Sequence, residues 1–296
     1  MTDPLLSSVL GEKISQKLHD QQHKPGLYVV ATPIGNILDI SLRALYIFKK
    51  SKYIFAEDTR QTKKLLNFYE IKTPLITCHE YNEDHPSVIS KIEPNDIYAL
   101  VSDAGTPLIS DPGYRIVDWC VKHQIEVFPV PGACAPIAGL SAAGLPTDNF
   151  TFHGFLPSKA RARRSRLDIV KDMTSTAVFL ESPERILDSL QDMLEIFGDR
   201  RACICREITK IFEEFRRGNL SELIEYFSKN KPIGEFLVII SGKREICIDK
   251  GAAFVELSAE LKTETLKNAV MKVFSKYEIS KKAIYDKALE IKRESS

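Results

Sequence analysis

Thirteen consecutive residues, 101–113, combine small and polar side chains in a way that suits a binding loop. They read VSDAGTPLISDPG, with two glycines, two prolines, two aspartates, two serines and a threonine. Proline lacks an N–H donor and glycine permits unusual backbone angles, so this stretch cannot form a regular element. An apolar run (97–101) precedes it and a helical pattern (114–123) follows it. We expect a ligand-binding loop at the carboxyl end of a strand, with a plain surface turn as the alternative.

Three further turns at predicted strand ends carry unusual residues. TPIGN (32–36) and PVPGACA (129–135) are small and bear proline and glycine, so their backbone amides can approach a flat or extended ligand. AEDTR (56–60) is charged and could act in the site, or Asp58 or Thr59 could cap the following helix. In a parallel sheet all these turns project from the same edge.

The absence of two common nucleotide-binding motifs narrows the class of ligand that these loops could bind. The chain has no G-x-G-x-x-G and no G-x-x-x-x-G-K-S/T, which excludes the common dinucleotide and P-loop phosphate sites. A polar ligand held mainly by backbone suits an adenosyl group with an amino-acid tail better than ATP. ESPER (181–185) and REITK (206–210) are charged strand ends that we expect to face the first domain across a cleft.

One stretch, SKARARRSR (158–166), is strongly basic and contains no acid. Its cations could form a solvated helix face, or they could bind a phosphate backbone, because phosphate contacts dominate nucleic-acid affinity. The nearby residues Phe152, His153 and Phe155 could stack bases or be part of the core. The five cations are Lys159, Arg161, Arg163, Arg164 and Arg166.

Composition indicates an ordinary globular protein. The 296 residues are 44% hydrophobic and carry a net charge of +1, so a nucleic-acid role needs a local basic patch. No apolar run reaches membrane-spanning length, and a secretory signal is not evident. The six cysteines form no C-x-x-C pair and the histidines form no H-E-x-x-H motif. We expect no metal, and buried thiols in a reducing cytoplasm.

The elements that position these motifs alternate between strands and helices. Five apolar runs, each followed by a turn and most by a helical pattern, predict a buried parallel sheet. Later runs, one of them rich in phenylalanine with alternating charges (211–217), predict a mixed sheet. The fold class is therefore α/β, with a flexible leader (1–25), a parallel-sheet domain (26–143), a mixed-sheet domain (144–242) and a helical extension (243–296).

The extension has two helical patterns across a tight turn. Apolar residues from Leu266 to Tyr277 repeat at helical spacing, and Ser280 is the expected N-cap of a second helix. Such a pair resembles a helix-turn-helix. It could contact RNA, although packing against the body or a second subunit is the favoured interpretation.

The motifs closely resemble the family of small-subunit ribosomal RNA (cytidine-2′-O)-methyltransferases, which has the tetrapyrrole methylase fold. The resemblance runs from about residue 26 to 241, and ISKKAIYDKAL (279–289) resembles the family's carboxyl-terminal helical motif. It departs at Leu180, Glu184 and Ile233, where tyrosine, histidine and lysine are expected. The motifs, in order, are TPIGN, AEDTR, SDAGTPLISDPG, PVPGACA, FLESPER, CREITK and GEF.

The resemblance implies a class III S-adenosylmethionine-dependent methyltransferase that works as a cytoplasmic homodimer on a decoding-region cytidine of 16S rRNA. The cofactor would be folded in the cleft between the two α/β domains. A methylase of a tetrapyrrole or corrin precursor is the alternative, and a non-enzymatic RNA-binding module is a second one. Implied cofactor-binding residues are Pro33, Gly35, Asp103, Ala104, Gly105, Thr106, Leu108, Cys134, Ala135, Glu181, Ile208 and Gly234.

A ribose hydroxyl is a poor nucleophile, so a base or a cation that lowers its pKa should assist methyl transfer. The candidates are Asp58, Glu207 and Lys210. The candidates for binding RNA or the developing oxyanion are Arg60, Arg185 and Arg206, beside the five cations of residues 158–166.

Overall fold

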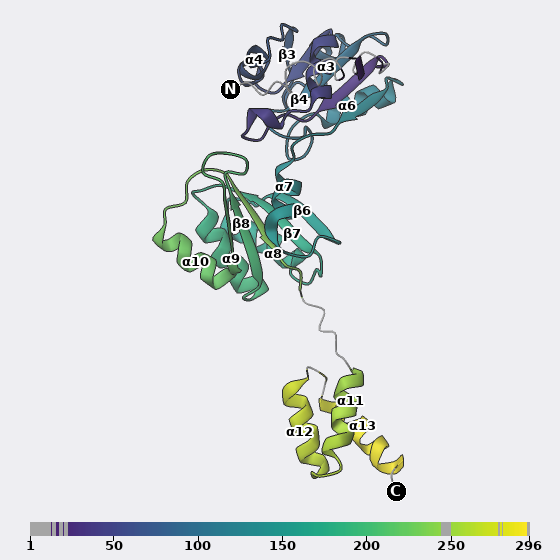
Figure 1. Ribbon diagram of the computed structural model, residues 1–296, viewed down its shortest axis with the longest axis vertical. Coiled ribbons are helices and arrows are strands. Elements are labelled where there is room, and N and C mark those ends of the chain that lie inside the picture. The colour runs from purple at the N-terminus through teal and green to yellow at the C-terminus, as the bar shows by residue number, and fades with distance from the viewer. Residues whose placement is uncertain are drawn as a thin grey trace. The chain divides into compact units, whose positions relative to one another are not determined.

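The computed structural model describes residues 23–243, 250–277, 279 and 281–294, with residues 13, 16, 17 and 20 of the amino-terminal segment. The chain divides into two compact units, residues 1–243 and 244–296, which are shown in Figure 1. Most of the expected leader, and the expected cap Ser280, lie outside the described residues.

The first sheet is five-stranded and entirely parallel, as its apolar runs predict. Its order is β3-β2-β4-β1-β5, so the loops that follow β1 and β4 leave the sheet as neighbours. Helices cover both faces and leave a hydrophobic core on each side. The strands are β1 (Gly26–Val30), β2 (Tyr53–Ala56), β3 (Leu75–Thr77), β4 (Ile97–Val101) and β5 (Val127–Val130).

Two of the helices around this sheet, α3 (Leu42–Lys50) and α4 (Thr59–Phe68), begin at side chains that accept backbone N–H groups. Ser41 caps the first and Asp58 the second, as expected for the AEDTR turn. A third helix begins at Gly113, which has no side chain to cap it. The elements are η1 (Ile37–Asp39), α3 (Leu42–Lys50), α4 (Thr59–Phe68), α5 (Pro86–Ile89) and α6 (Tyr114–Lys122).

The second sheet is mixed, which confirms the predicted architecture. Its order is β6-β7-β10-β8-β9, with β6 parallel to β7 and the other pairs antiparallel. The phenylalanine-rich run becomes an antiparallel edge strand shifted a few residues towards the carboxyl terminus. The strands are β6 (Phe150–Phe155), β7 (Thr176–Glu181), β8 (Arg201–Arg206), β9 (Glu214–Asn219) and β10 (Phe236–Ile240).

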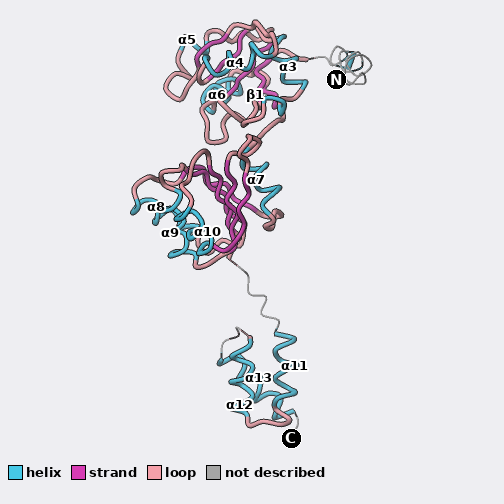
Figure 2. The backbone as a smooth tube through the Cα atoms, turned by 60° about the vertical axis from the view of Figure 1, so that its left-hand side comes forward, coloured by secondary structure: helices cyan, strands magenta, loops and turns pink. Residues whose placement is uncertain are grey.

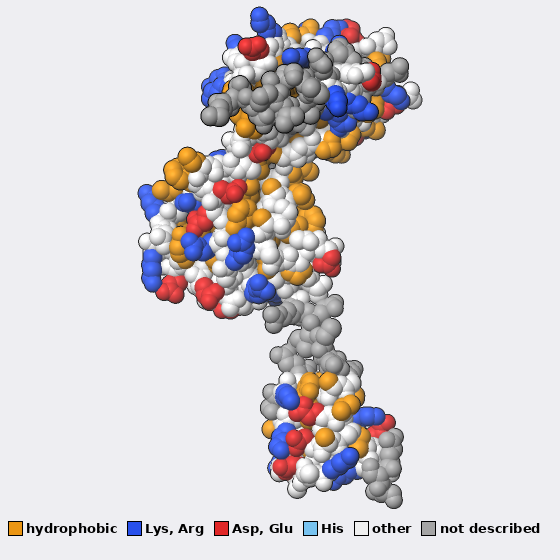
Figure 3. Space-filling view, in the orientation of Figure 1, with side chains coloured by type: hydrophobic (Ala, Val, Ile, Leu, Met, Phe, Trp, Pro, Cys, Tyr) orange, Lys and Arg blue, Asp and Glu red, His pale blue; other side chains and the backbone are white. Residues whose placement is uncertain are grey.

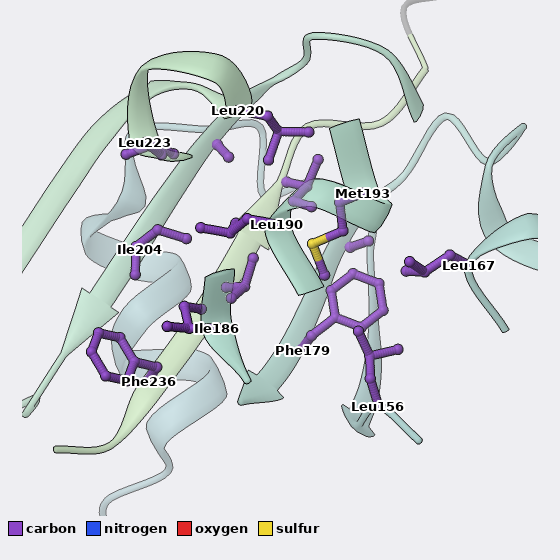
Figure 4. Packing of buried hydrophobic residues seen from close by; sticks show 14 of the residues in the cluster. Leu156, Leu167, Phe179, Ile186, Leu190, Met193, Ile204, Leu220, Leu223 and Phe236 are labelled. Atoms are coloured by element: carbon purple, nitrogen blue, oxygen red, sulfur yellow. The ribbon is translucent and has the colours of Figure 1, made fainter. Parts of the chain in front are cut away.

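One face of the second sheet is covered by α8 (Ala160–Val170), α9 (Ile186–Phe197) and α10 (Leu220–Lys229). Figure 2 shows these helices on one side of the strands and α7 (Ala135–Ala143) on the other. Figure 4 shows the core on the three-helix side, where Phe179, Leu190 and Met193 belong to one cluster of buried side chains. The apolar side of each of these helices is buried here.

Helix α7 follows the last strand of the first sheet but packs against the second sheet. Leu140 and Ala143 share a core cluster with Val178 and Leu237. A Cβ on Gly139 would come within 2.3 Å of a Leu237 methyl group, so the helix lies very close to the strands. This packing favours a boundary between the two α/β lobes before α7, rather than at residue 143 as the sequence suggested. We propose a boundary near residues 131–134.

The carboxyl-terminal unit is helical, as predicted, and has its own hydrophobic core. It contains α11 (Lys250–Glu260), α12 (Leu266–Lys276) and α13 (Lys281–Glu294), of which α11 was not expected. Leu257, Val270 and Ile284 are among its buried residues. None of the helices that the structure describes combines the length and apolarity that a membrane crossing requires.

Candidate functional site

A cavity of about 360 Å³ lies between the carboxyl edge of the first sheet and the second sheet. The loops after β1 and β4, the start of α7, and the ends of β7 and β8 with the start of β10 form its walls. This size is typical of small-molecule sites, and the wall contains mostly small and apolar side chains. The site therefore suits an extended organic ligand held largely by backbone groups.

The loop after β4 is tied to its neighbours on both sides. Thr32 and Gly105 form a bridge, with N···O distances of 2.8 and 3.1 Å. The Thr106 hydroxyl donates to the Ala133 carbonyl at 3.0 Å, which joins this loop to the segment before α7. Gly105 has a φ of +80°, a conformation that glycine adopts readily. Three strand-end segments are thus held as one wall of the cavity.

The same loop also contains backbone conformations that are unfavourable for ordinary residues. Leu108 and Ser110 have φ values of 71° and 69°. On the opposite wall, Glu207 and Thr209 have φ values of 51° and 66°. Such residues cost about 1–3 kcal/mol each and cluster at ligand sites, where the surrounding structure holds them.

The two walls meet where the loop after β1 reaches the loop after β8. The backbone N–H of Asn36 donates to the Thr209 hydroxyl at 3.0 Å. Gly35 packs directly against this loop, and a Cβ on it would lie 2.7 Å from the Thr209 hydroxyl oxygen. The sequence marked Gly35 as a cofactor residue, but its neighbours are protein atoms of the second lobe.

Arg217 fixes the helix that carries part of the cavity wall. Its guanidinium donates to the carbonyls of Ala142 and Ala143, at 2.6 and 3.2 Å. These carbonyls are at the carboxyl end of α7, where a cation is favourable. The other end of α7 brings Cys134 and Ala135 to the cavity.

Glu181 is a buried carboxylate in the cavity wall, and its oxygens are fully engaged. Oε1 accepts the N–H of Ser182 and pairs with the Arg185 guanidinium, both at 2.8 Å. Oε2 accepts the hydroxyl of Ser189 at 2.6 Å. Arg185 also donates to the Leu156 carbonyl at 3.1 Å. The expected RNA role of Arg185 therefore disagrees with its placement, because the second lobe uses this guanidinium internally.

Lys210, Glu207 and Glu235 form an ionic cluster at the cavity rim. The Lys210 ammonium lies 2.9 Å from a carboxylate oxygen of each glutamate. Burial alone would raise the pKa of Glu207, but the Glu235 N–H and the Lys210 ammonium lower it below its usual value. Glu207 is therefore a weak base, although the sequence made it a candidate proton acceptor.

Asp58 is likewise held as an anion. Its carboxylate forms a two-point contact with Arg60, the shortest distance being 2.7 Å, and it caps α4. The Arg60 hydrogen bonds lower the pKa of Asp58 to about 2. Asp58 does not line the cavity, but its N–H donates to the Asp103 carboxylate at 3.0 Å. Its place is beside the loop after β4 and not inside the cavity.

The structure places most of the predicted cofactor residues on the cavity wall and some behind it. Pro33, Gly35, Asp103 and Leu108 belong to wall-forming loops without lining the cavity. Sequence reasoning missed Ser110 and Asp111, although both lie in the loop it singled out, and it missed Cys205. The predicted residues that line the cavity are Ala104, Gly105, Thr106, Cys134, Ala135, Glu181, Ile208 and Gly234.

The basic stretch divides into buried and exposed cations. Arg163 is only 4% exposed and its Nε lies 2.7 Å from Asp192, a placement that is unfavourable for the expected RNA contact. Arg164 pairs with Asp192 at 2.6 Å and with Glu195. Lys159, Arg161 and Arg166 are exposed and form no ion pair within the described part of the chain. The sequence could not separate them, because the partner acids lie on α9.

The aromatic residues near this stretch have different surroundings. Phe152 packs against the α7 core, and His153 stacks on Phe179 with ring centroids 5.0 Å apart. Phe155 is 57% exposed and lines the cavity, so it alone of the three is available to a ligand.

The described residues contain no group of three or more side chains that could hold a metal ion. Figure 3 shows acidic and basic side chains interspersed over the visible face of the second lobe. The cavity, with its backbone-rich wall and small side chains, fits an adenosyl ligand better than a phosphate-rich one.

Comparisons with known proteins agree with this geometry. The sequence model of the tetrapyrrole (corrin/porphyrin) methylases matches residues 26–224. A protein of Halalkalibacterium halodurans called ribosomal RNA small subunit methyltransferase I is 46% identical over 235 residues, which cover 79% of this chain and 81% of that protein. Its namesake in Mesorhizobium japonicum is 42% identical over 277 residues, which cover 91% of this chain and 93% of that protein.

A solved structure supports the fold. Cobalt precorrin-4 methyltransferase, called a cobalamin biosynthetic enzyme, is 14% identical, with a TM-score of 0.53 over 73% of this chain and 94% of its own. At this identity the likeness concerns the fold alone.

Proposed function

This chain belongs to the ribosomal RNA small subunit methyltransferase I family within the tetrapyrrole methylases, and we propose that it transfers a methyl group from S-adenosylmethionine to the 2′-hydroxyl of a decoding-region cytidine in 16S rRNA. The observation that carries the proposal is the cavity between the lobes, whose walls include the strand-end loops of both sheets. We also propose that the protein acts in the cytoplasm, that it forms a homodimer, and that its substrate is 16S rRNA within the small ribosomal subunit.

The donor would be held by both walls of the cavity. Ala104, Gly105 and Thr106 offer backbone groups on one wall, and Ile208 and Gly234 close the other. Cys134 and Ala135 contribute the start of α7 between them. Pro33, Asp103 and Leu108 would support these groups from the adjoining loops. When bound, the donor supplies an electrophilic methyl group on a sulfonium sulfur.

The contribution of the protein is mainly alignment. The ribose oxygen must approach the methyl carbon in line with the bond that breaks, and holding both reactants supplies much of the rate acceleration. The bridges between Thr32 and Gly105, and between Asn36 and Thr209, fix the walls that set this alignment. Exclusion of water from the cavity by both lobes would prevent competing reactions.

The RNA would be held by exposed cations. Lys159, Arg161 and Arg166 on and beside α8 are the strongest candidates, because no described carboxylate neutralises them. Arg164 and Arg60 are exposed but already paired, so we assign them a secondary role. Phe155 lies where it could stack on a nucleobase at the cavity mouth.

The test is a methylation assay with isotopically labelled S-adenosylmethionine and four acceptors. These are naked 16S rRNA, a decoding-region fragment, assembled small subunits and a precorrin. Digestion to nucleosides and mass spectrometry should find 2′-O-methylcytidine in one of the RNA acceptors. Methyl transfer to the precorrin alone would favour the tetrapyrrole alternative, and methylation of a nucleobase would contradict ribose specificity.

A further inference from the structure

Three carboxylates line the described part of the cavity, and two of them form ion pairs with cationic side chains. Glu181 has a side chain only 1% exposed, and both its oxygens have partners. Glu235 has a side chain 80% exposed and pairs with Lys210 at 2.9 Å. The third is Asp111, which belongs to the loop after β4.

Asp111 has surroundings unlike those of the other two. It is half-buried, and no described lysine or arginine lies within ion-pair distance of it. The charged groups that face its carboxylate are the acids Asp103 and Glu57. Burial and then Asp103 raise the pKa of Asp111 above its usual value. A carboxylate in these surroundings is a stronger base than an ion-paired one.

The backbone on both sides of Asp111 is held in place. Ser110 has a φ of 69°, and a Cβ on Gly154 of β6 would lie 3.1 Å from the Ser110 hydroxyl. On the other side, the N–H of Gly113 donates to Glu83 at 2.8 Å. The carboxylate thus belongs to a segment that is hydrogen-bonded to Glu83 and lies close to β6, which suits a group that must meet a reacting atom.

We propose that Asp111 is the catalytic residue that accepts the proton of the ribose hydroxyl during methyl transfer. The inference rests on the proposed function. In this step the ribose oxygen forms a bond to the methyl carbon, and the bond between that carbon and the sulfonium sulfur breaks. The sulfur leaves with the electron pair as a neutral thioether, and the hydroxyl proton passes to the Asp111 carboxylate. No further reactant is needed.

A different role for Asp111 would be to bind the ammonium group of the donor's amino-acid tail. The two roles predict different kinetics. Loss of a proton acceptor lowers kcat at saturating S-adenosylmethionine. Loss of a residue that binds S-adenosylmethionine raises the dissociation constant of that cofactor. The Asp111→Asn variant keeps the shape of the side chain and removes its basicity. Asp118→Asn on α6 is the matched control, because Asp118 forms a surface ion pair with Lys122 and has no other ion pair among the described residues.

The experiment measures kcat on the RNA acceptor that wild type methylates, and donor affinity by calorimetry. We expect Asp111→Asn to lower kcat by about 10²–10⁴-fold. Its affinity for S-adenosylmethionine should stay within about threefold of the wild-type value, and Asp118→Asn should match wild type in both. A 100-fold loss of donor affinity with wild-type kcat at saturation would overturn the inference, and so would unchanged kcat.

The pH dependence of the wild-type enzyme provides a test that needs no variant of Asp111. At saturating donor, kcat should fall on the acid side as the Asp111 carboxylate becomes protonated. Asp103→Asn removes the neighbouring negative charge that raises the pKa of Asp111, so it should move this acid limb to lower pH. An unmoved limb would contradict the inference. If wild type methylates no ribose in any RNA, the proposed function itself fails, which is a separate outcome.

Discussion

Gly35 and Lys210 approach so closely that a Cβ added to the glycine would lie 2.5 Å from Cγ of the lysine. The two residues belong to different lobes, and the contact lies beside the hydrogen bond from Asn36 to Thr209. Only a residue without a side chain permits this approach, so the contact sets the distance between the two cavity walls.

Replacing Gly35 with alanine should force the walls apart. Overpacking of this kind costs about 1–3 kcal/mol of unfolding free energy. We expect donor affinity to fall by tenfold or more, measured by calorimetry with S-adenosylhomocysteine. Gly198→Ala is the control, because Gly198 has a φ of +77° with no atom within 4 Å of an added Cβ. It should lose stability and keep donor affinity, and equal affinities in the two variants would contradict the role of the contact.

Glu83 should prove to be the residue that holds the carboxyl end of the loop between β4 and α6. Its Oε2 accepts the N–H groups of Gly113 and Arg115, at 2.8 and 2.9 Å, and caps α6 from outside the helix. Glu83→Ala should cost about 1–3 kcal/mol of unfolding free energy, because it leaves buried N–H groups unpaired. Donor affinity should fall in parallel.

Glu83→Gln keeps an acceptor oxygen, so it should lose clearly less free energy of unfolding than Glu83→Ala, as measured by urea unfolding. Glu80→Ala changes an exposed glutamate of the same segment and should behave like wild type. Equal losses for Glu83→Ala and Glu80→Ala would show that the capping bonds are unimportant.

Substitutions in the basic helix α8 should affect either the stability of the protein or its binding to RNA, depending on whether the cation is buried or exposed. Arg163→Ala leaves Asp192 buried with one partner fewer, so the free energy of unfolding should fall by about 3–5 kcal/mol. Arg161→Ala should change it by less than about 0.5 kcal/mol. Arg161→Ala should instead weaken RNA binding. It should also reduce the slope of the logarithm of RNA affinity against the logarithm of salt concentration by about one. A salt dependence unchanged in Arg161→Ala would remove this residue from the proposed RNA surface.

Arg60 should control the titration of Asp58. The folded-state pKa of Asp58 is lowered from 3.8 to about 2, so its stabilising contribution is complete above pH 4 and is lost as the pH falls towards 2. Arg60→Ala should raise this pKa towards 3.8, which a carboxyl-carbon NMR titration can follow. Acid unfolding of the variant should then depend less steeply on pH between 4 and 2. A carboxyl titration still centred near 2 would show that another group holds the anion.

The strands and loops of the first sheet could be predicted because their signals are local. The apolar runs 53–56 and 97–101 match β2 and β4 residue for residue. The loop between β4 and α6 was recognisable because no regular element accommodates its glycines and prolines. Asp58 could be recognised as a candidate cap because a cap acts on the next few residues.

Partners distant in sequence could not be predicted. Nothing in residues 158–166 shows that Arg163 meets Asp192, or that Arg164 meets Glu195, because both acids lie on the next helix. Glu83 is thirty residues away from the N–H group that it caps. The placement of α7 on the second sheet depends on Gly139, whose lack of a side chain matters only once Leu237 is beside it.

Because α7 is seated on the second sheet, only residues 131–134 connect it to the last strand of the first sheet. Four residues span at most about 14 Å when fully extended. The covalent tether between the lobes is therefore shorter than a typical strand, and its last residue also lines the cavity. A protease cut within these four residues would leave two fragments that must reassociate before they could hold a ligand, which makes the tether a natural place to split the protein into a binding-dependent reporter.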